Sequence, residues 1–235
     1  TITLGPGRTP VKIHCGVPVA IDGKEDVKPE HLSLALASVP LTEQVLVGYG
    51  VTVKLIDSGT AKVDGELTGA TAQINSVAAA ASTVAAACAD GKIFVWRGSL
   101  PSPAGCTSIE CPDEVRCLAL SSDGLSLLAG CDDTVGRIWS LSAKGEEPPP
   151  PRLLSEHDDW IYSCALSRAG DIAVTGDDAS LRIWRVPESG NARCVSTIPL
   201  NTGVFGCAIH GDSALSASLD IKNSIFFSRI ISFNI

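Results

Sequence analysis

The sequence predicts an all-β protein built from a repeated unit of about four short strands. The first observation is a segment that recurs at nearly constant spacing: "CADGKIFVW" ends at Trp96, "CDDTVGRIW" at Trp139 and "GDDASLRIW" at Trp184. The second is that apolar and polar residues alternate within "GRIW" and "LRIW". An alternation with a period of two is typical of a β-strand.

The repeat extends beyond these three copies. Weaker copies place His14, Ile56 and Phe226 where the others have tryptophan, and the six aligned positions lie 40 to 45 residues apart. Four copies carry an aspartate six residues before the aligned position: Asp90, Asp133, Asp178 and Asp220. A fixed period of this length indicates a supersecondary unit that stacks on copies of itself.

Each unit reads as four strands separated by turns. In "VRCLALSSDGLSLLAGCDD" one turn lies at Ser122-Asp123-Gly124 and a second at Asp132-Asp133; the tryptophan segment is the third strand, and "RLLS" from Arg152 to Ser155 fits the fourth. The alanine-rich stretch over 77–89 favours helix by propensity, but its register with the neighbouring units predicts strands.

A lone four-stranded sheet of this size cannot bury both of its faces, whereas radial stacking of such sheets can. We therefore predict a β-propeller of four-stranded antiparallel blades, with about five units and part of a sixth, as expected for an incomplete ring or a fragment. Residues 1–29 are expected to form a leader with the last strands of the partial blade, and residues 30–235 the propeller.

Composition bounds the classes of partner. The chain is 45% hydrophobic, which is enough for a sizeable core, and its net charge is −8. An acidic surface repels phosphate, so direct binding of nucleic acid or of an anionic membrane is disfavoured. No run of 18 apolar residues is present, so no membrane-spanning helix is predicted.

The nine cysteines indicate packing rather than chemistry. They include no Cys-x-x-Cys pair, and five of them recur at two fixed positions of the repeat: Cys88 and Cys131, and Cys117, Cys164 and Cys207. Recurring cysteines of this kind behave as small buried residues. We predict no metal site and no cofactor, and an intracellular location in the cytoplasm or nucleus, where thiols stay reduced.

The repeat resembles the WD-repeat family of β-propellers. The resemblance rests on Asp90-Gly91, on the other turn aspartates and on the three tryptophans, and "EHDDWIYSCALS" over 156–167 is similar to the Gly-His segment of the family, with Glu156 in place of the glycine. The aspartate that follows the tryptophan in the family is replaced here by Arg97, Ser140 and Arg185.

The resemblance implies a buried hydrogen-bonded network in one blade, formed by His157, Thr175, Asp178 and Trp184. It implies the same structural positions, incompletely occupied, at Asp133 with Trp139 and at Asp90 with Trp96. Because the Asp-Asp pair of Asp132-Asp133 recurs in the next unit, we interpret it as a structural turn rather than an acid–base pair.

Two segments are candidates for binding other proteins. The loop segment "HDDWIY" places Asp158, Asp159, Trp160 and Tyr162 before an inner strand, and aromatic residues dominate interface energetics; the alternative is that Trp160 is a core anchor between blades. The polyproline run Pro148-Pro151 could dock on an SH3-like or WW-like module, or serve as a solvated spacer.

The resemblance implies a non-catalytic scaffold for protein–protein interaction within a multiprotein complex. Two alternatives stay open: a propeller enzyme, a hydrolase or lyase with a channel-facing site, and a WD-repeat subunit of an RNA-processing or ribosome-assembly particle. No catalytic, cofactor-binding or metal-binding residue is predicted.

Overall fold

The computed structural model describes residues 35–40, 42–103, 105–142, 146–200, 202–210, 213–219 and 225–232. Within these ranges the chain forms nineteen strands in five antiparallel sheets. No helix of the described residues is long and apolar enough to cross a membrane. The predicted partial blade over 1–29, its boundary at residue 30 and the turn residue Asp220 lie outside the described residues.

Each sheet consists of strands that follow one another in sequence. The first holds β1 (Ala35–Ser38), β2 (Gln44–Tyr49), β3 (Thr52–Asp57) and β4 (Val63–Leu67). The second holds β5 (Ile74–Ala80), β6 (Thr83–Cys88), β7 (Lys92–Arg97) and β8 (Gly105–Glu110). The third holds β9 (Val115–Leu120), β10 (Ser126–Cys131), β11 (Gly136–Ser140) and β12 (Arg152–Leu154).

The last two sheets continue the same order. The fourth holds β13 (Ser163–Leu166), β14 (Ile172–Gly176), β15 (Ser180–Arg185) and β16 (Arg193–Pro199). The fifth holds β17 (Val204–His210), β18 (Ser213–Leu219) and β19 (Ile225–Ser232). The predicted all-β fold with four-stranded antiparallel blades is confirmed, and the fifth sheet has three strands in the part of the chain described.

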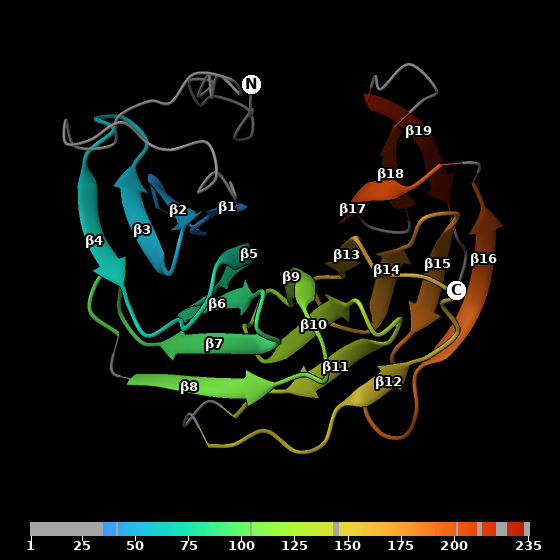
Figure 1. Cartoon of the computed structure of the whole chain (residues 1–235), viewed down its shortest axis with the longest axis horizontal. Coiled ribbons are helices and arrows are strands. Elements are labelled where there is room, and N and C mark those ends of the chain that lie inside the picture. Colours follow the sequence, from blue (N-terminus) through green and yellow to red (C-terminus); the bar gives the residue numbers. More distant parts are fainter. Residues whose placement is uncertain are drawn as a thin grey trace.

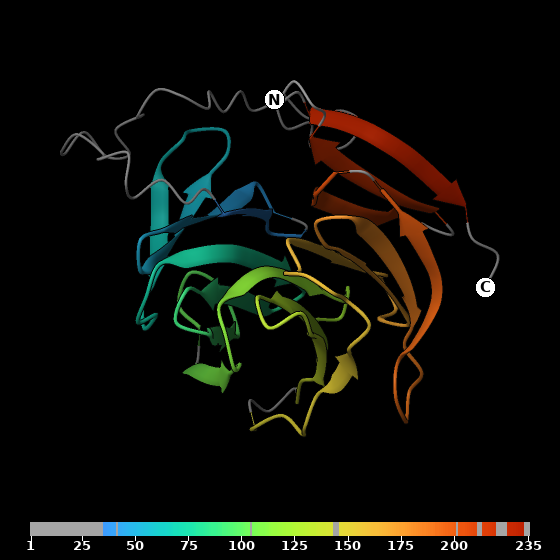
Figure 2. The same ribbon diagram turned by 45° about the vertical axis from the view of Figure 1, so that its right-hand side comes forward.

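The sheets fan around an arc, with the first strand of each sheet on the inside (Figure 1). These inner strands, β1, β5, β9, β13 and β17, pack against one another in sequence order. The turned view shows successive sheets packing face to face, from the blue and teal sheet β1–β4 to the red sheet β17–β19 (Figure 2). No described strand of the first sheet is hydrogen-bonded to a described strand of the last, so the five sheets make part of a ring.

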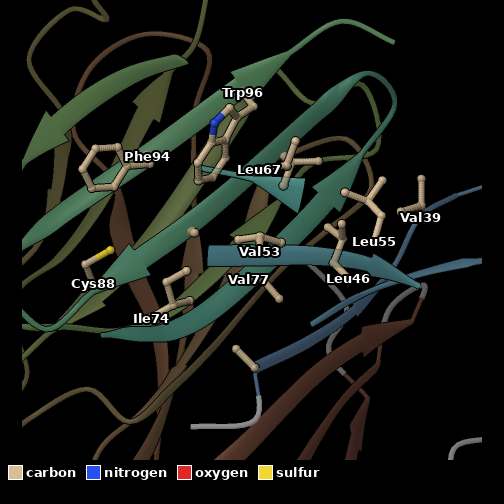
Figure 3. Close-up of a cluster of buried hydrophobic side chains, with 13 residues drawn as sticks. Val39, Leu46, Val53, Leu55, Leu67, Ile74, Val77, Cys88, Phe94 and Trp96 are labelled. Atoms are coloured by element: carbon tan, nitrogen blue, oxygen red, sulfur yellow. The ribbon is translucent and has the colours of Figure 1, made fainter. Parts of the chain in front are cut away.

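Four apolar clusters fill the four layers between successive sheets. Figure 3 shows the first of these, where Leu46 and Val53 of the first sheet lie near Ile74, Val77 and other residues of the second. Burying a side chain of leucine or valine size stabilises the fold by about 1.5–3 kcal/mol relative to leaving it exposed. The core is thus distributed between sheets, as expected for units that cannot bury both faces alone.

The alanine-rich segment forms the strands β5 and β6, as its register predicted and against its helix propensity. All six residues of β6 are buried, and Ala85, Ala86 and Ala87 have no exposed surface. The strand is central in its sheet and is covered on both faces, so packing outweighs the intrinsic preference of alanine.

The antiparallel order determines which loops share a face. The turn between the second and third strands of a sheet and the connection into the next inner strand lie at the same end of the strands. The Asp132-Asp133 turn, the loop over 155–162 and the Asp177-Asp178 turn therefore project from one end of the arc. The candidate partner-binding residues Asp158, Asp159, Trp160 and Tyr162 lie at this end, whereas Pro148-Pro151 lie in the connection between β11 and β12 at the other end.

Candidate interaction surface and the buried network beneath it

His157 lies in the loop before β13, and its buried imidazole is hydrogen-bonded through both nitrogens. Nε2 is 2.5 Å from the hydroxyl of Thr175, and Nδ1 is 2.6 Å from Oδ2 of Asp177. The indole Nε1–H of Trp184 donates to the same Thr175 hydroxyl at 2.7 Å. Nη1 of Arg182, which can only donate, also lies 2.8 Å from Nδ1, so which ring nitrogen of His157 carries the proton depends on the tautomer.

The neutral form of the His157 imidazole is favoured in this network. Burial lowers the pKa of His157, and its effect outweighs the neighbouring Asp177 carboxylate, which acts to raise it. The imidazole is therefore a structural connector with no ring nitrogen left for a substrate.

The carboxylate of this network is Asp177, and the prediction of Asp178 is wrong: Asp177 is buried, whereas Asp178 is exposed. The reason is a difference in register between hairpins. Trp96 pairs with Val84 and Trp139 pairs with Leu127, each twelve residues earlier in the sequence. Trp184 pairs with Ala173, which is only eleven residues earlier, so this hairpin is one residue shorter. The tighter hairpin turns the preceding aspartate, Asp177, inward.

Asp177 is held from all sides. Its Oδ1 accepts the backbone N–H groups of Ala179 at 3.0 Å and Ser180 at 2.6 Å, and its Oδ2 accepts the Ser180 hydroxyl at 2.9 Å. Arg182 donates to the same Oδ2 at 2.6 Å and approaches the exposed carboxylate of Asp158 at 3.6 Å. Burial alone would raise the pKa of Asp177, but the hydrogen bonds from His157, Ala179 and Ser180 lower it.

Arg182 thereby connects the buried network to the loop that precedes β13. The sequence contained a signal for this role, because Arg137 and Arg182 each stand two residues before the tryptophan of their unit. Arg137, in the preceding unit, also pairs with a turn aspartate. Arg137 binds both oxygens of Asp133, at 2.9 and 2.5 Å. The two arginines stand on the same face of β11 and β15 in the alternating pattern.

The other predicted structural positions are occupied differently in each sheet. Trp139 is buried between the second and third sheets, while Asp133 of the same blade forms an ion pair with Arg137. In the second sheet the exposed Asp90 accepts the hydroxyl of Thr71 at 2.5 Å, and Trp96 donates from Nε1 to the carbonyl of Thr68 at 3.2 Å. Among the described blades, the connected histidine network is therefore seen in the fourth sheet.

The four predicted partner-binding residues do lie together on the loop before β13. Trp160 is 45% exposed, so the alternative in which it anchors the core between blades is wrong. Its ring lies edge-on to Tyr162, with centroids 6.3 Å apart. Asp159 accepts the backbone N–H of Trp160 at 2.7 Å, and the side chain of Asp158 is 98% exposed.

Two further residues join this group that sequence reasoning missed. The guanidinium of Arg116 lies 4.8 Å from the ring centroid of Trp160 and 5.8 Å from that of Tyr162. On the other side, the ring of Phe205 lies 5.3 Å from Tyr162 and is 52% exposed. We call Trp160, Tyr162, Phe205 and Arg116 the aromatic platform; it bridges the third, fourth and fifth sheets.

The platform residues share a position that could have indicated them. Arg116 and Phe205 each follow a fully buried β-branched residue at the start of an inner strand, Val115 and Val204, and Tyr162 follows the fully buried Ile161 just before β13. Since side chains alternate along a strand, the residue after the buried one points away from the core. Asp132 then fixes Arg116 through a two-pronged ion pair, with Nη2 at 2.6 Å from Oδ2.

Possible metal ligands are dispersed in the described part of the chain, and its thiols differ in their pKa values. Within the described ranges, no three His, Cys, Asp or Glu side chains lie close enough together to hold a metal ion. Burial raises the pKa of the Cys207 thiol to about 12 and that of Cys88 to about 11. Cys111 differs, because a hydrogen bond with Cys131 lowers its pKa.

Comparison with known proteins now identifies the repeat. The family model described as "WD domain, G-beta repeat" matches residues 106–140 and 149–185, which cover the third and most of the fourth sheet. These two segments of the chain are WD repeats. The predicted resemblance to the WD-repeat propellers is thereby confirmed.

Similar curated proteins include the guanine nucleotide-binding protein subunit beta of Arabidopsis thaliana, 28% identical over 153 residues, which are 61% of this chain and 37% of that protein. The SEC13 homolog of Rattus norvegicus is 28% identical over 90 residues, 38% of this chain and 25% of that one. The chain thus spans well under half of the length of these relatives.

Solved structures show the same fold. The RRP9 WD40 repeats superpose with a TM-score of 0.68 at 19% identity, covering 79% of this chain and 59% of that one. A chain of the mitotic checkpoint complex superposes with a TM-score of 0.67 at 20% identity, covering 86% of this chain and 62% of that chain. At 19% and 20% sequence identity, these superpositions show that the fold is shared and nothing more.

Proposed function

We propose that this WD-repeat chain is a non-catalytic interaction module that holds another protein within a multiprotein complex. The observation that carries the proposal is the aromatic platform, in which Trp160 and Phe205 each leave about half of their surface exposed. Aromatic and arginine side chains supply most of the binding energy at protein–protein interfaces. Neighbouring aromatic rings and an arginine that together bridge three sheets are therefore suited to an interface.

The platform is also held in place before any partner arrives. Asp132 fixes Arg116, Asp159 caps the backbone of Trp160, and Arg182 ties Asp158 to the buried network. Side chains that are already ordered lose less conformational entropy on association. This rigidity supports a binding role over that of a mobile surface loop.

The same proposal holds that the chain is non-catalytic, and this part is supported by the hydrogen bonds and ion pairs that its polar side chains already make. His157 is buried and engaged at both ring nitrogens. Asp132 and Asp133, the adjacent carboxylates that would be needed as an acid–base pair, are each bound by a different arginine. None of these groups is free to accept a proton from a substrate.

The test compares the double variant W160A/F205A with a matched control, L153A/V195A, which removes exposed apolar side chains from the outer strands β12 and β16. Each form is affinity-purified from the source cell and the co-purified proteins are quantified by mass spectrometry. We expect W160A/F205A to lose at least one protein that the control retains at the wild-type level. Equal recovery with both variants would refute the proposal.

A second surface remains a proposal of its own. Pro149 and Pro150 are exposed in the connection between β11 and β12, and Arg152 anchors the end of that connection by donating to the Ser140 hydroxyl at 3.0 Å. We propose that Pro148-Pro151 binds an SH3-like or WW-like module there. A P149A/P150A variant should abolish capture of such a module, and unchanged capture would leave the run as a spacer.

The proposed location is intracellular, in the cytoplasm or nucleus. All eight cysteines in the described ranges are free thiols, which agrees with a reducing compartment. Imaging of the tagged chain in the source cell would test this location, and secretion into the medium would contradict it.

A further inference from the structure

The surroundings of the aromatic platform carry an excess of negative charge. Asp158, Asp159 and Asp178 are all exposed at this end of the arc. The arginines described there are already matched by other carboxylates: Arg116 by Asp132, Arg137 by Asp133 and Arg182 by Asp177. Arg182 also lies 3.6 Å from Asp158, but a single arginine cannot neutralise both Asp158 and Asp177, so the three exposed aspartates form a net negative rim at this end of the arc.

Two observations place Asp159 and Asp178 beside the rings. Desolvation raises the pKa of the Tyr162 hydroxyl, and the negative charges of Asp159 and Asp178 raise it further. At Gly203, an added Cβ would lie 2.9 Å from the Phe205 ring and 3.0 Å from Oδ1 of Asp178. The glycine therefore lets Asp178 and Phe205 approach the same point, one from β14–β15 and one from β17.

The platform already holds one cation of its own chain. The guanidinium of Arg116 stacks over Trp160 at 4.8 Å while Asp132 neutralises it. Aromatic faces attract guanidinium groups, and a carboxylate at the ring edge completes the pairing. Phe205 beside Asp178 offers the same combination, an exposed ring next to a carboxylate, with no described cation in place.

We propose that the aromatic platform binds a segment of a partner protein that carries arginine or lysine side chains, stacked on Phe205 and Trp160 and paired with Asp158, Asp159 and Asp178. This inference rests on the proposed function and adds the chemistry of the partner. Arginine should be preferred over lysine, because its planar guanidinium can stack on a ring and bind a carboxylate through two hydrogen bonds at once.

The test uses three fluorescein-labelled peptides of equal length, made of three copies of Gly-Ser-Arg, Gly-Ser-Lys or Gly-Ser-Gln, and measures binding to the full chain by fluorescence polarisation. We expect the affinity to fall from the arginine to the lysine to the glutamine peptide. W160A/F205A should weaken the arginine peptide by about tenfold or more, as for central interface aromatics. W160F, which keeps an aromatic ring, should retain most of the binding.

Charge is tested by two variants of equal net charge. D158N/D159N/D178N removes the negative rim, whereas E146Q/E147Q/E188Q removes three carboxylates from the connections at the opposite end of the strands. The first should weaken the arginine peptide by about tenfold and reduce its salt dependence, while the second should change the affinity by less than about twofold. Circular dichroism melts of all variants establish that they remain folded.

Several outcomes would overturn the inference. Equal weakening by the two charge variants would show attraction to net charge alone, and preferential binding of the glutamine peptide or of a uridine oligonucleotide would show different partner chemistry. If no basic peptide binds while W160A/F205A still loses a co-purified protein, this inference fails and the proposed function stands. If W160A/F205A loses no partner, the proposed function fails as well.

Discussion

Replacing Thr175 by valine removes one hydroxyl from the centre of the buried network and keeps the shape of the side chain. That hydroxyl serves two buried groups, since it accepts from Nε1–H of Trp184 at 2.7 Å and is hydrogen-bonded to Nε2 of His157 at 2.5 Å. Thr175 has no exposed surface, so water cannot take over either role in the folded chain.

The expected cost follows from these two lost partners. A buried donor or acceptor left without a partner costs about 1–3 kcal/mol, so T175V should lower the free energy of unfolding by about 2–4 kcal/mol. The lower part of that range applies if the imidazole shifts toward another donor. Valine itself is well tolerated in the strand β14, so strand propensity does not add to the loss.

Urea unfolding followed by tryptophan fluorescence measures this cost, with T197V as the control. Thr197 is exposed on the outer strand β16, so its replacement should change stability by less than about 0.5 kcal/mol. If T175V unfolds at the same urea concentration as the wild type and T197V, the hydrogen-bonded network does not stabilise the fold.

Three further predictions concern the same architecture. D177N should lower the free energy of unfolding in urea by about 1–3 kcal/mol, whereas D178N should change it by less than about 0.5 kcal/mol. The reverse order would support the sequence-based assignment of Asp178 to the network. Because the pKa of His157 is lowered in the fold, its stabilising contribution should be present above its ordinary value of 6.5 and lost as the pH falls from there toward the folded-state pKa; urea midpoints that stay constant from pH 8 to 5 would contradict this. G130A should lower the melting temperature, because the added Cβ would lie 2.5 Å from Sγ of Cys117; an unchanged melt would show that the strand can shift freely.

The strands and their order could be predicted because the repeat imposes the same pattern several times. Even the alanine-rich β5 and β6 were recovered from register, although propensity alone pointed to a helix. The carboxylate of the network, Asp177, could not be predicted in this way. Aligning the copies on their tryptophans hides that the hairpin of Trp184 is one residue shorter than those of Trp96 and Trp139. Which residues face each other in a hairpin depends on how its two strands pair, and the spacing of the repeats along the sequence does not reveal it.

The aromatic platform could be predicted only in part. The loop segment "HDDWIY" drew attention to Trp160 and Tyr162, but its sequence has no period that would tell an exposed ring from a buried one. Arg116 and Phe205 come from other units, and the arc of sheets brings all four side chains together. A surface built from three sheets becomes visible when the sheets are placed in space.

The most direct measurement of whether the platform is a docking surface is site-specific photocrosslinking in the source cell. A photoreactive phenylalanine analogue is placed at Trp160, at Phe205 or, as the control, at Val195 on the outer strand β16. Adducts to the same partner protein from the first two positions, and none from Val195, are the predicted result. Adducts that form from Val195 but from neither Trp160 nor Phe205 would contradict the account.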